Sequence, residues 1–218
     1  MLWPPEQEID YPTSDGLPMA ETDTHRDQMI DLIHGLRNFF AGRRDVYVSG
    51  NLLMYYVKGD KRKHRSPDVL VTLGIPGGSR DCYQVWEEGK APDLIFEITS
   101  RSTESEDRGE KKGVYEFLGV REYVLFDPLG EYLRPNPSLF RLKKGSFVPV
   151  VGKPLQLETL GLELVVRDGR LRLRRPDTGV LLPTVEETTR LAEQEKARAE
   201  RAEAELARLR AELDRRGR

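Results

Sequence analysis

The pattern of apolar and polar positions in the first third of the chain predicts one helix followed by short strands. Between Asp23 and Gly42, apolar residues recur every three or four positions, which indicates an amphipathic helix that Asp23 or Thr24 caps and Gly42 ends. The polar segments at 58–65 and 74–89 are predicted loops. The apolar runs around them predict strands over residues 46–48, 52–57 and 68–73.

The middle of the chain carries the strongest strand pattern. Residues 93–99 read DLIFEIT, an apolar and partly β-branched run that is typical of a strand buried on both faces. A helix is expected from Ser102 or Thr103 until Gly119 ends it, and a second strand follows at 122–126. A strand, a helix and a strand of this combined length form a βαβ unit. The pattern therefore predicts two parallel neighbours in a mixed sheet.

Beyond residue 130, short apolar runs alternate with Gly and Pro, which predicts an antiparallel β extension. Residues 1–18, rich in proline and acidic residues, are a predicted N-terminal arm. Residues 19–183 then form an α/β domain with a mixed sheet flanked by helices, and residues 184–218 form a helical tail. The strands expected in the extension are 139–142, 147–151, 162–166 and 171–173.

The tail contains neither Gly nor Pro from residue 184 to residue 216, and a seam with alternating three- and four-residue steps runs along it. Thr, Ala and Glu occupy much of the first two thirds of this seam, and leucines occupy its end. A coiled-coil dimer and a solvated single helix are both compatible with this pattern. The seam residues are Val185, Thr188, Ala192, Glu195, Ala199, Ala202, Leu206, Leu209 and Leu213.

Charge and cysteine content exclude several classes of protein. The formal net charge is -2, so the chain is not a globally basic nucleic-acid coat, although a local basic patch is compatible with this value. Cys82 is the only cysteine, which excludes an intrachain disulfide and a multi-cysteine zinc site. The first residues lack the basic and apolar regions of a signal peptide, and no apolar run approaches the ~20 residues of a membrane span. We therefore expect a cytoplasmic protein without a membrane partner.

Two acidic residues accompany the predicted strands. Asp68 opens one of them, and Glu97 is the only charged residue in the apolar run at 94–98. A buried, ionised and unpaired Glu97 would cost several kcal/mol, so a cation, a proton or hydrogen bonds must compensate it. A strand end that reaches solvent, or a salt bridge to Lys111, would also account for this residue.

The predicted helix after Glu97 carries a positively charged side chain, that of Lys111. Asp107, Lys111 and Tyr115 follow one another at four-residue steps, which places them on one face of that helix. Two carboxylates on neighbouring strands can hold a hard divalent cation, and a nearby ammonium can stabilise the charge that builds on a phosphate. This combination is typical of metal-assisted phosphodiester hydrolysis.

These residues belong to a longer set of motifs between residues 67 and 128. The set comprises Pro67-Asp68, residues 91–100 (APDLIFEITS), Ser102-Thr103, Asp107, Lys111, Tyr115, residues 119–123 (GVREY) and residues 126–128 (FDP). With these motifs the chain resembles the Uma family of bacterial restriction endonucleases, in the PD-(D/E)xK nuclease superfamily. The resemblance implies a restriction-endonuclease-like core, DNA as partner, and Mg²⁺ as natural ion with Mn²⁺ as substitute. It also implies metal ligation by Asp68, Glu97 and the carbonyl of Ile98.

The chain departs from the superfamily pattern at two places. Thr99 stands two residues after the glutamate, where the pattern has a lysine. The resemblance to the family implies that this lysine lies on the following helix instead, which makes Lys111 the candidate. Pro12 stands where the family often has a glutamate, and Glu21 is the candidate substitute. Asp107 is a further accessory candidate.

The predicted loop at 58–65 is strongly basic and lies directly before Asp68. It is either a solvated loop or a clamp for DNA phosphates. Charge alone does not distinguish these two roles. As a clamp, its candidate substrate-binding residues are Lys61, Arg62, Lys63 and Arg65.

The resulting hypothesis is a Mg²⁺-dependent endodeoxyribonuclease. Asp68 and Glu97 bind the ion, and Lys111 orients the nucleophile or offsets negative charge. A homodimer formed through the C-terminal helix would carry two active sites, which suits the cleavage of two strands. The alternative is a catalytically inactive nuclease fold that binds DNA or protein, and the change at Thr99 and the mildly acidic net charge favour it.

Overall fold

The computed structural model describes residues 11–14, 16, 22–101 and 103–216. It comprises two compact units, residues 1–182 and 183–218. The helices of the first unit are α1 (Asp23–Phe39), α2 (Val85–Glu88), α3 (Glu104–Glu106), the π-helix η1 (Asp107–Lys111) and α4 (Lys112–Phe117). Its strands are β1 (Val46–Ser49), β2 (Met54–Tyr55), β3 (His64–Arg65), β4 (Val69–Leu73), β5 (Tyr83–Gln84), β6 (Leu94–Ile98), β7 (Glu122–Phe126), β8 (Ser138–Lys143), β9 (Ser146–Pro149), β10 (Leu155–Leu157), β11 (Leu162–Arg167) and β12 (Arg170–Arg174).

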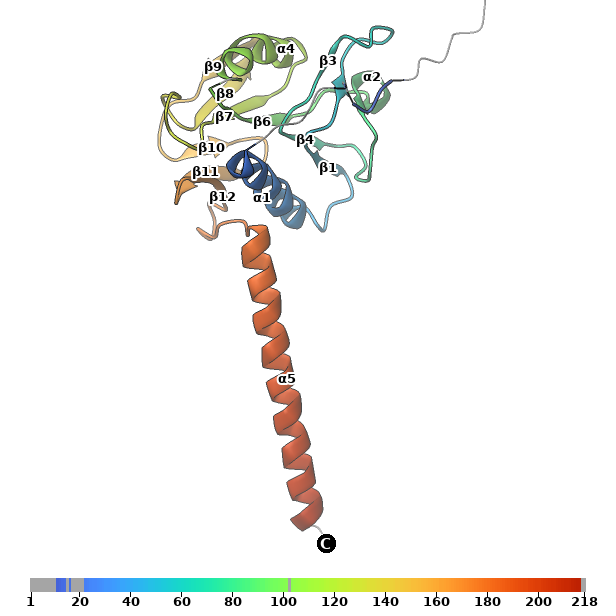
Figure 1. The fold of residues 1–218 in the computed structure, drawn as a ribbon, viewed down its shortest axis with the longest axis vertical. Coiled ribbons are helices and arrows are strands. Elements are labelled where there is room, and N and C mark those ends of the chain that lie inside the picture. The colour runs from blue at the N-terminus through green and yellow to red at the C-terminus, as the bar shows by residue number, and fades with distance from the viewer. Residues whose placement is uncertain (1–10, 15, 17–21, 102, 217–218) are drawn as a thin grey trace, which may run out of the picture. The chain divides into compact units, whose positions relative to one another are not determined.

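A six-stranded sheet in the order β1-β4-β6-β7-β8-β9 forms the centre of the first unit (Figure 1). Within this sheet β6 and β7 are parallel, and the other neighbouring pairs are antiparallel. The α/β fold with a mixed sheet and the parallel pair expected of a βαβ unit are therefore confirmed.

Alternation along the strands directs side chains into two separate cores. On β6, Leu94, Phe96 and Ile98 join a core that α1 and the small sheet β10-β11-β12 share. Ile95 joins the second core, which includes Tyr115 of α4. α1 and α4 therefore cover opposite faces of the sheet, as Figure 1 shows. Glu97 follows the same alternation as Ile95, so its side chain points to the face under α4.

The structure changes the prediction at the start of α1 and in the shortest elements. The N-cap of α1 is Thr22 and not Asp23 or Thr24, because the Thr22 side chain accepts a hydrogen bond from the main-chain N–H of His25 at 3.2 Å. β2 is much shorter than the strand predicted at 52–57, and the predicted loops contain β3, β5 and α2. Elements of two to four residues are too short to give a periodic pattern.

The segments on either side of β7 also differ from their predicted form. The single helix expected to end at Gly119 consists of α3, η1 and α4 in succession, although Gly119 does end it with a positive φ of 79°. The predicted antiparallel extension is divided, because β8 and β9 continue the main sheet whereas β10, β11 and β12 form a sheet of their own. β10 was not among the predicted strands.

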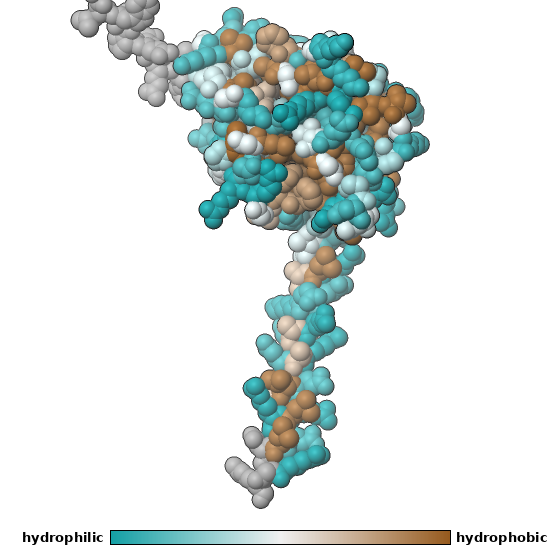
Figure 2. Space-filling model, turned by 180° about the vertical axis from the view of Figure 1, so that it is seen from behind, coloured by the Kyte–Doolittle hydropathy of each residue, from teal (hydrophilic) through white to brown (hydrophobic). Residues whose placement is uncertain are grey.

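The second unit is the helix α5 (Val185–Arg216). Thr184 and Glu187 form a capping box: the Thr184 N–H donates to Glu187 Oε2 at 2.9 Å, and the Glu187 N–H donates to Thr184 Oγ1 at 3.1 Å. Figure 2 shows apolar side chains gathered along the last turns of this helix, where Leu206, Leu209 and Leu213 are 50%, 52% and 68% exposed. The helical form of the tail is confirmed, and its association into a coiled coil stays a prediction. Among the described helices, none is both long and apolar enough to cross a bilayer.

Candidate active site

Asp68 and Glu97 meet where β4 and β6 lie side by side. The antiparallel register pairs Val69 with Phe96, so continuing it by one residue places Asp68 opposite Glu97. The main-chain N–H of Ile98 donates to Asp68 Oδ2 at 2.6 Å, which fixes the carboxylate beside the end of β6. The two acids that the sequence singled out are therefore neighbours, and Ile98, the third predicted metal ligand, lies beside them.

Glu97 is completely buried, and both of its carboxylate oxygens have donors from the helical segment above the sheet. The ammonium of Lys111 donates to Oε2 at 3.0 Å, and the hydroxyl of Tyr115 donates to Oε1 at 2.7 Å. These contacts supply the compensation that a buried carboxylate needs. Thr99, two residues after Glu97, is also buried, and its N–H donates to the carbonyl of Phe126 in the sheet.

The π-helical turn η1 places the ammonium of Lys111 beside Glu97. It runs from Asp107 to Lys111, and the Lys111 ammonium forms an ion pair with Asp107 Oδ1 at 3.0 Å. Asp107 is itself buried, and its carbonyl accepts a hydrogen bond from the Tyr123 hydroxyl at 2.9 Å. Single π-turns of this kind are frequent at functional sites. Asp107, Lys111 and Tyr115 lie on one face of the helical segment, as their spacing predicts.

Burial and charge together perturb the protonation of this cluster. Burial raises the pKa of Glu97 well above its ordinary value, the Lys111 ammonium opposes this shift, and Asp68 and Asp107 add to it. Burial alone would lower the pKa of Lys111, but the surrounding carboxylates raise it above its usual value, so the side chain stays an ammonium. Burial also raises the pKa of Tyr115, which therefore remains a neutral donor.

The donor set is of the type that binds a hard cation. Three carboxylates, those of Asp68, Glu97 and Asp107, surround one ammonium, so negative charge is in excess. Mg²⁺ prefers such oxygen donors and uses one or two carboxylates together with water and phosphate oxygens. Among the described residues, no group of three or more histidine, cysteine or acidic side chains is arranged to hold a metal ion by itself. The site therefore fits Mg²⁺ in donor type and charge, as two carboxylates completed by other oxygens.

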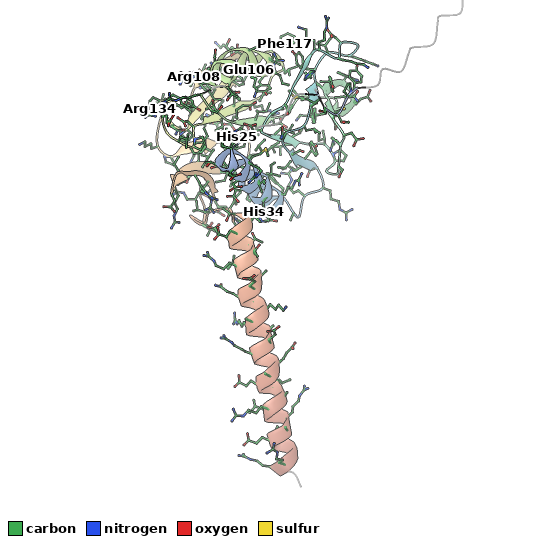
Figure 3. The ribbon with its side chains drawn as sticks, viewed as in Figure 1. His25, His34, Glu106, Arg108, Phe117 and Arg134 are labelled. Carbon is green, nitrogen blue, oxygen red and sulfur yellow. The ribbon has the colours of Figure 1, made fainter. Side chains whose placement is uncertain are left out.

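His25 is a member of this site that the sequence did not reveal. It lies on the first turn of α1 (Figure 3), and its Nε2 is 3.2 Å from Asp68 Oδ1, with only 15% of its side chain exposed. Asp68 is thus held between the Ile98 N–H and an imidazole from the opposite layer. The helical pattern of the sequence does not indicate which strand end α1 approaches, so the contact of His25 with Asp68 could not be predicted.

Gly50 also belongs to the construction of the site. A Cβ at this position would overlap with the carbonyl oxygen of Asp68 and press against the Ile33 side chain. The next residue, Asn51, donates its N–H to the carbonyl of Pro67 at 2.8 Å. The segment after β1 therefore approaches the Asp68 main chain so closely that only glycine fits.

The structure separates the four basic candidates of the predicted clamp. Arg65, on β3, is half-buried and bonded to Glu110 of η1, the neighbour of Lys111. Lys61, Arg62 and Lys63 are exposed, and Arg62 is paired with Asp60 at 2.9 Å. Of the four, Arg65 is thus the one bonded to the segment that carries Lys111. Glu21, the predicted accessory acid, lies outside the described residues.

Three comparisons with known proteins differ in what they find. A search of curated proteins gave no match. A solved structure that resembles the chain is that of a "putative nuclease belonging to DUF820" from Anabaena variabilis ATCC 29413, with 14% sequence identity and a TM-score of 0.46. The match covers 76% of this chain and 80% of that one. Residues 2–167 match the model of the Uma2 family, whose description is "Putative restriction endonuclease". Because this match spans well over half of the sequence, the chain belongs to the Uma2 family.

Proposed function

We propose that the protein is a Mg²⁺-dependent endodeoxyribonuclease that hydrolyses phosphodiester bonds of DNA, with Mn²⁺ as a substitute ion. The observation that carries this proposal is the meeting of Asp68, Glu97 and Lys111, from three separate elements, at one end of β6. Glu97 has two donors of its own and two further carboxylates nearby, which is the surplus of negative charge that a cation would offset.

Each residue of the site has a distinct role in this proposal. Asp68, Glu97 and the carbonyl of Ile98 would hold the ion, which when bound supplies Lewis-acid stabilisation of the charge that builds on a phosphate. The Lys111 ammonium would orient the attacking water or offset that charge. Tyr115 and Asp107 hold Glu97 and Lys111 in place, and His25 holds Asp68. Arg65 would contact a DNA phosphate next to the site.

The test combines metal binding with DNA cleavage. Mg²⁺ and Mn²⁺ are titrated by calorimetry into the wild type, Asp68→Asn and Glu97→Gln, and each protein is then incubated with supercoiled plasmid. We expect the wild type to bind metal and nick the plasmid, and the two variants to lose affinity and nicking rate by about 100-fold or more. Full cleavage by either variant would contradict the proposal.

Glu163→Gln is the matched control for these substitutions. Glu163 is also a buried glutamate of a strand, and it pairs with Arg174 at 2.7 Å in the sheet β10-β11-β12. Its replacement removes a buried carboxylate without touching the candidate site. Metal affinity and nicking at the wild-type level are expected for this variant, so loss of function in Glu97→Gln would not reflect the loss of a buried acid in general.

A second candidate function is a nuclease fold that has become a binding module for DNA or protein. Two observations favour it. Thr99 stands where the superfamily pattern has a lysine. Three of the four carboxylate oxygens of Asp68 and Glu97 accept hydrogen bonds from the protein, and the fourth lies 3.2 Å from His25 Nε2. A scaffold of this kind has no need for metal affinity. Wild-type protein that binds neither Mg²⁺ nor Mn²⁺ would therefore favour the binding module over the enzyme.

The proposed partner besides DNA is a second copy of the chain, through the seam of α5. The cytoplasm is the proposed location, where a lone cysteine such as Cys82 stays reduced.

A further inference from the structure

A cavity of about 350 Å³ opens between the helical segment and the strands β7 and β8. Arg108 of η1 and Lys112 of α4 line one side of it, and Arg134, from the connection between β7 and β8, lines the other. Figure 3 shows Arg108 and Arg134 at the same end of the first unit. Apart from the polar Ser138, the rest of the lining is apolar and consists of Leu125, Leu133, Pro135, Leu139, Phe140, Pro149 and Val150.

The cations of this cavity are poorly neutralised by the protein. Within the described part of the chain, Arg134 donates to main-chain carbonyls alone, those of Leu133 at 2.7 Å and Gly130 at 2.8 Å. The Lys112 ammonium lies over the Phe140 ring, 4.3 Å from its centroid. Arg108 has a carboxylate partner, Glu104, at 3.2 Å. Among the described residues, no acidic side chain lines the cavity, so it keeps a surplus of positive charge.

Charge and shape together define the class of ligand. A dianionic phosphomonoester would match the surplus charge better than a single carboxylate, and arginine binds phosphate oxygens with two parallel donors. Apolar walls leave room for an attached organic group, and the volume lies in the range of small-molecule sites.

The position of the cavity on the sheet indicates which kind of phosphomonoester it would bind. Leu125 is the register partner of Glu97 on the neighbouring strand, so the cavity lies one strand away from the candidate active site on the same sheet. We propose that this cavity binds a nucleotide through its 5′-phosphate, either as a free nucleotide or as the phosphorylated end of a nucleic-acid strand. The assignment stands on the cavity itself and needs neither metal nor cleavage, so it can hold for an inactive chain.

Calorimetry of the full-length protein in the presence of EDTA tests this assignment. The titrants are AMP, adenosine, inorganic phosphate, and a short oligothymidylate with a 5′-phosphate or a 5′-hydroxyl. We expect AMP or the phosphorylated oligonucleotide to bind at least tenfold more tightly than its counterpart without the phosphate, and more tightly than inorganic phosphate. Preference for AMP identifies a free nucleotide as the source, and preference for the phosphorylated oligonucleotide identifies a strand end.

Single substitutions connect the binding to the cavity. Arg134→Gln and Lys112→Gln are each expected to weaken binding about tenfold. Arg175→Gln, whose arginine pairs with Asp177 outside the cavity, should bind like the wild type. Thermal unfolding of each variant shows whether it is folded. The Lys112 ammonium donates no hydrogen bond to any described residue, so Lys112→Gln keeps the test valid if Arg134→Gln is unstable. Equal binding of adenosine and AMP, no binding of any phosphate compound, or unchanged affinity in both variants would overturn the assignment.

Discussion

The ammonium of Lys111 reaches Glu97 from a helical turn fourteen positions along the chain, while the strand position two residues after the glutamate holds a threonine. The four-residue steps from Asp107 to Tyr115 are visible in the sequence, so this half of the candidate site could be predicted. The other half could not. His25 and Gly50 approach Asp68 from segments whose packing depends on the whole sheet, and neither carries a local pattern that indicates this contact.

Substitution of Gly50 tests how strictly the site depends on one close approach. In Gly50→Ala the added methyl group overlaps with the Asp68 carbonyl, so the main chain that carries the carboxylate must shift. We expect the free energy of unfolding to fall by about 2–3 kcal/mol, measured by urea denaturation. Mn²⁺ affinity of the folded fraction should fall as well.

Gly113→Ala is the control, and for it we expect the free energy of unfolding to rise rather than fall. Gly113 lies in α4 with no atom close to the position of an added Cβ, and its backbone is helical. Alanine should therefore raise the free energy of unfolding by about 0.5–1 kcal/mol. If both alanine variants have the stability of the wild type, the close approach at Gly50 is not required.

At the scale of elements, helices and strands with a long periodic pattern could be predicted from the sequence, and the shortest helices and strands could not. The patterns that predict α1, β4, β6, β7 and α5 extend over five residues or more, and each of these elements is present. β3, β5 and α2 are held by contacts with other segments rather than by their own pattern, as in the pairing of Met54 with both Arg65 and Tyr83. The same holds for the separation of β10, β11 and β12 from the main sheet, which depends on tertiary packing.

The turn after β7 is built around one buried carboxylate, which gives it a pH dependence. Burial raises the pKa of Asp127, but hydrogen bonds from the main-chain N–H groups of Tyr132, Leu133, Leu129 and Gly130 more than offset this and lower it. The unfolded chain then binds more protons than the folded one below the ordinary pKa of about 4. This contribution to stability is present above pH 4 and is lost as the pH falls through the lower, folded pKa.

Asp127→Asn isolates this contribution. We expect it to lower the free energy of unfolding by about 1–3 kcal/mol at pH 7, because an amide cannot accept all four bonds as strongly, and to flatten the dependence on pH below 4. Urea denaturation at pH 7, 5 and 3 measures both effects. Asp81→Asn, at an exposed aspartate outside this turn, should leave the curve unchanged. An unaltered acid dependence in Asp127→Asn would contradict this account.

At the scale of the whole molecule, the exposed leucines of α5 determine the expected assembly. Leu206, Leu209 and Leu213 form one seam and are at least half exposed in a single chain, which is costly for a helix unless another surface covers it. We expect light scattering after size exclusion to give twice the mass of one chain. Replacement of all three leucines by serine should give the mass of one chain.

Leu191 provides the control for the tail. It is 54% exposed on the same helix but lies off the seam, between Thr188 and Ala192. Leu191→Ser should therefore keep the assembly of the wild type. A wild-type protein that is monomeric at high concentration, or a serine-substituted seam that still forms dimers, would show that the seam does not mediate association.

The order of strands in the main sheet bears on how the protein folds. Because the order β1-β4-β6-β7-β8-β9 follows the order of the chain, each strand pairs with the strand of this sheet that precedes it, and the longest connection is the 23-residue segment 99–121. Asp68 directly precedes β4, Glu97 lies on β6 and Lys111 on η1, so all three residues, together with β7, lie between residues 68 and 126. During synthesis this half of the sheet can assemble before α5 has left the ribosome. Pairing of two chains through α5 would then join subunits whose carboxylate cluster is already in place.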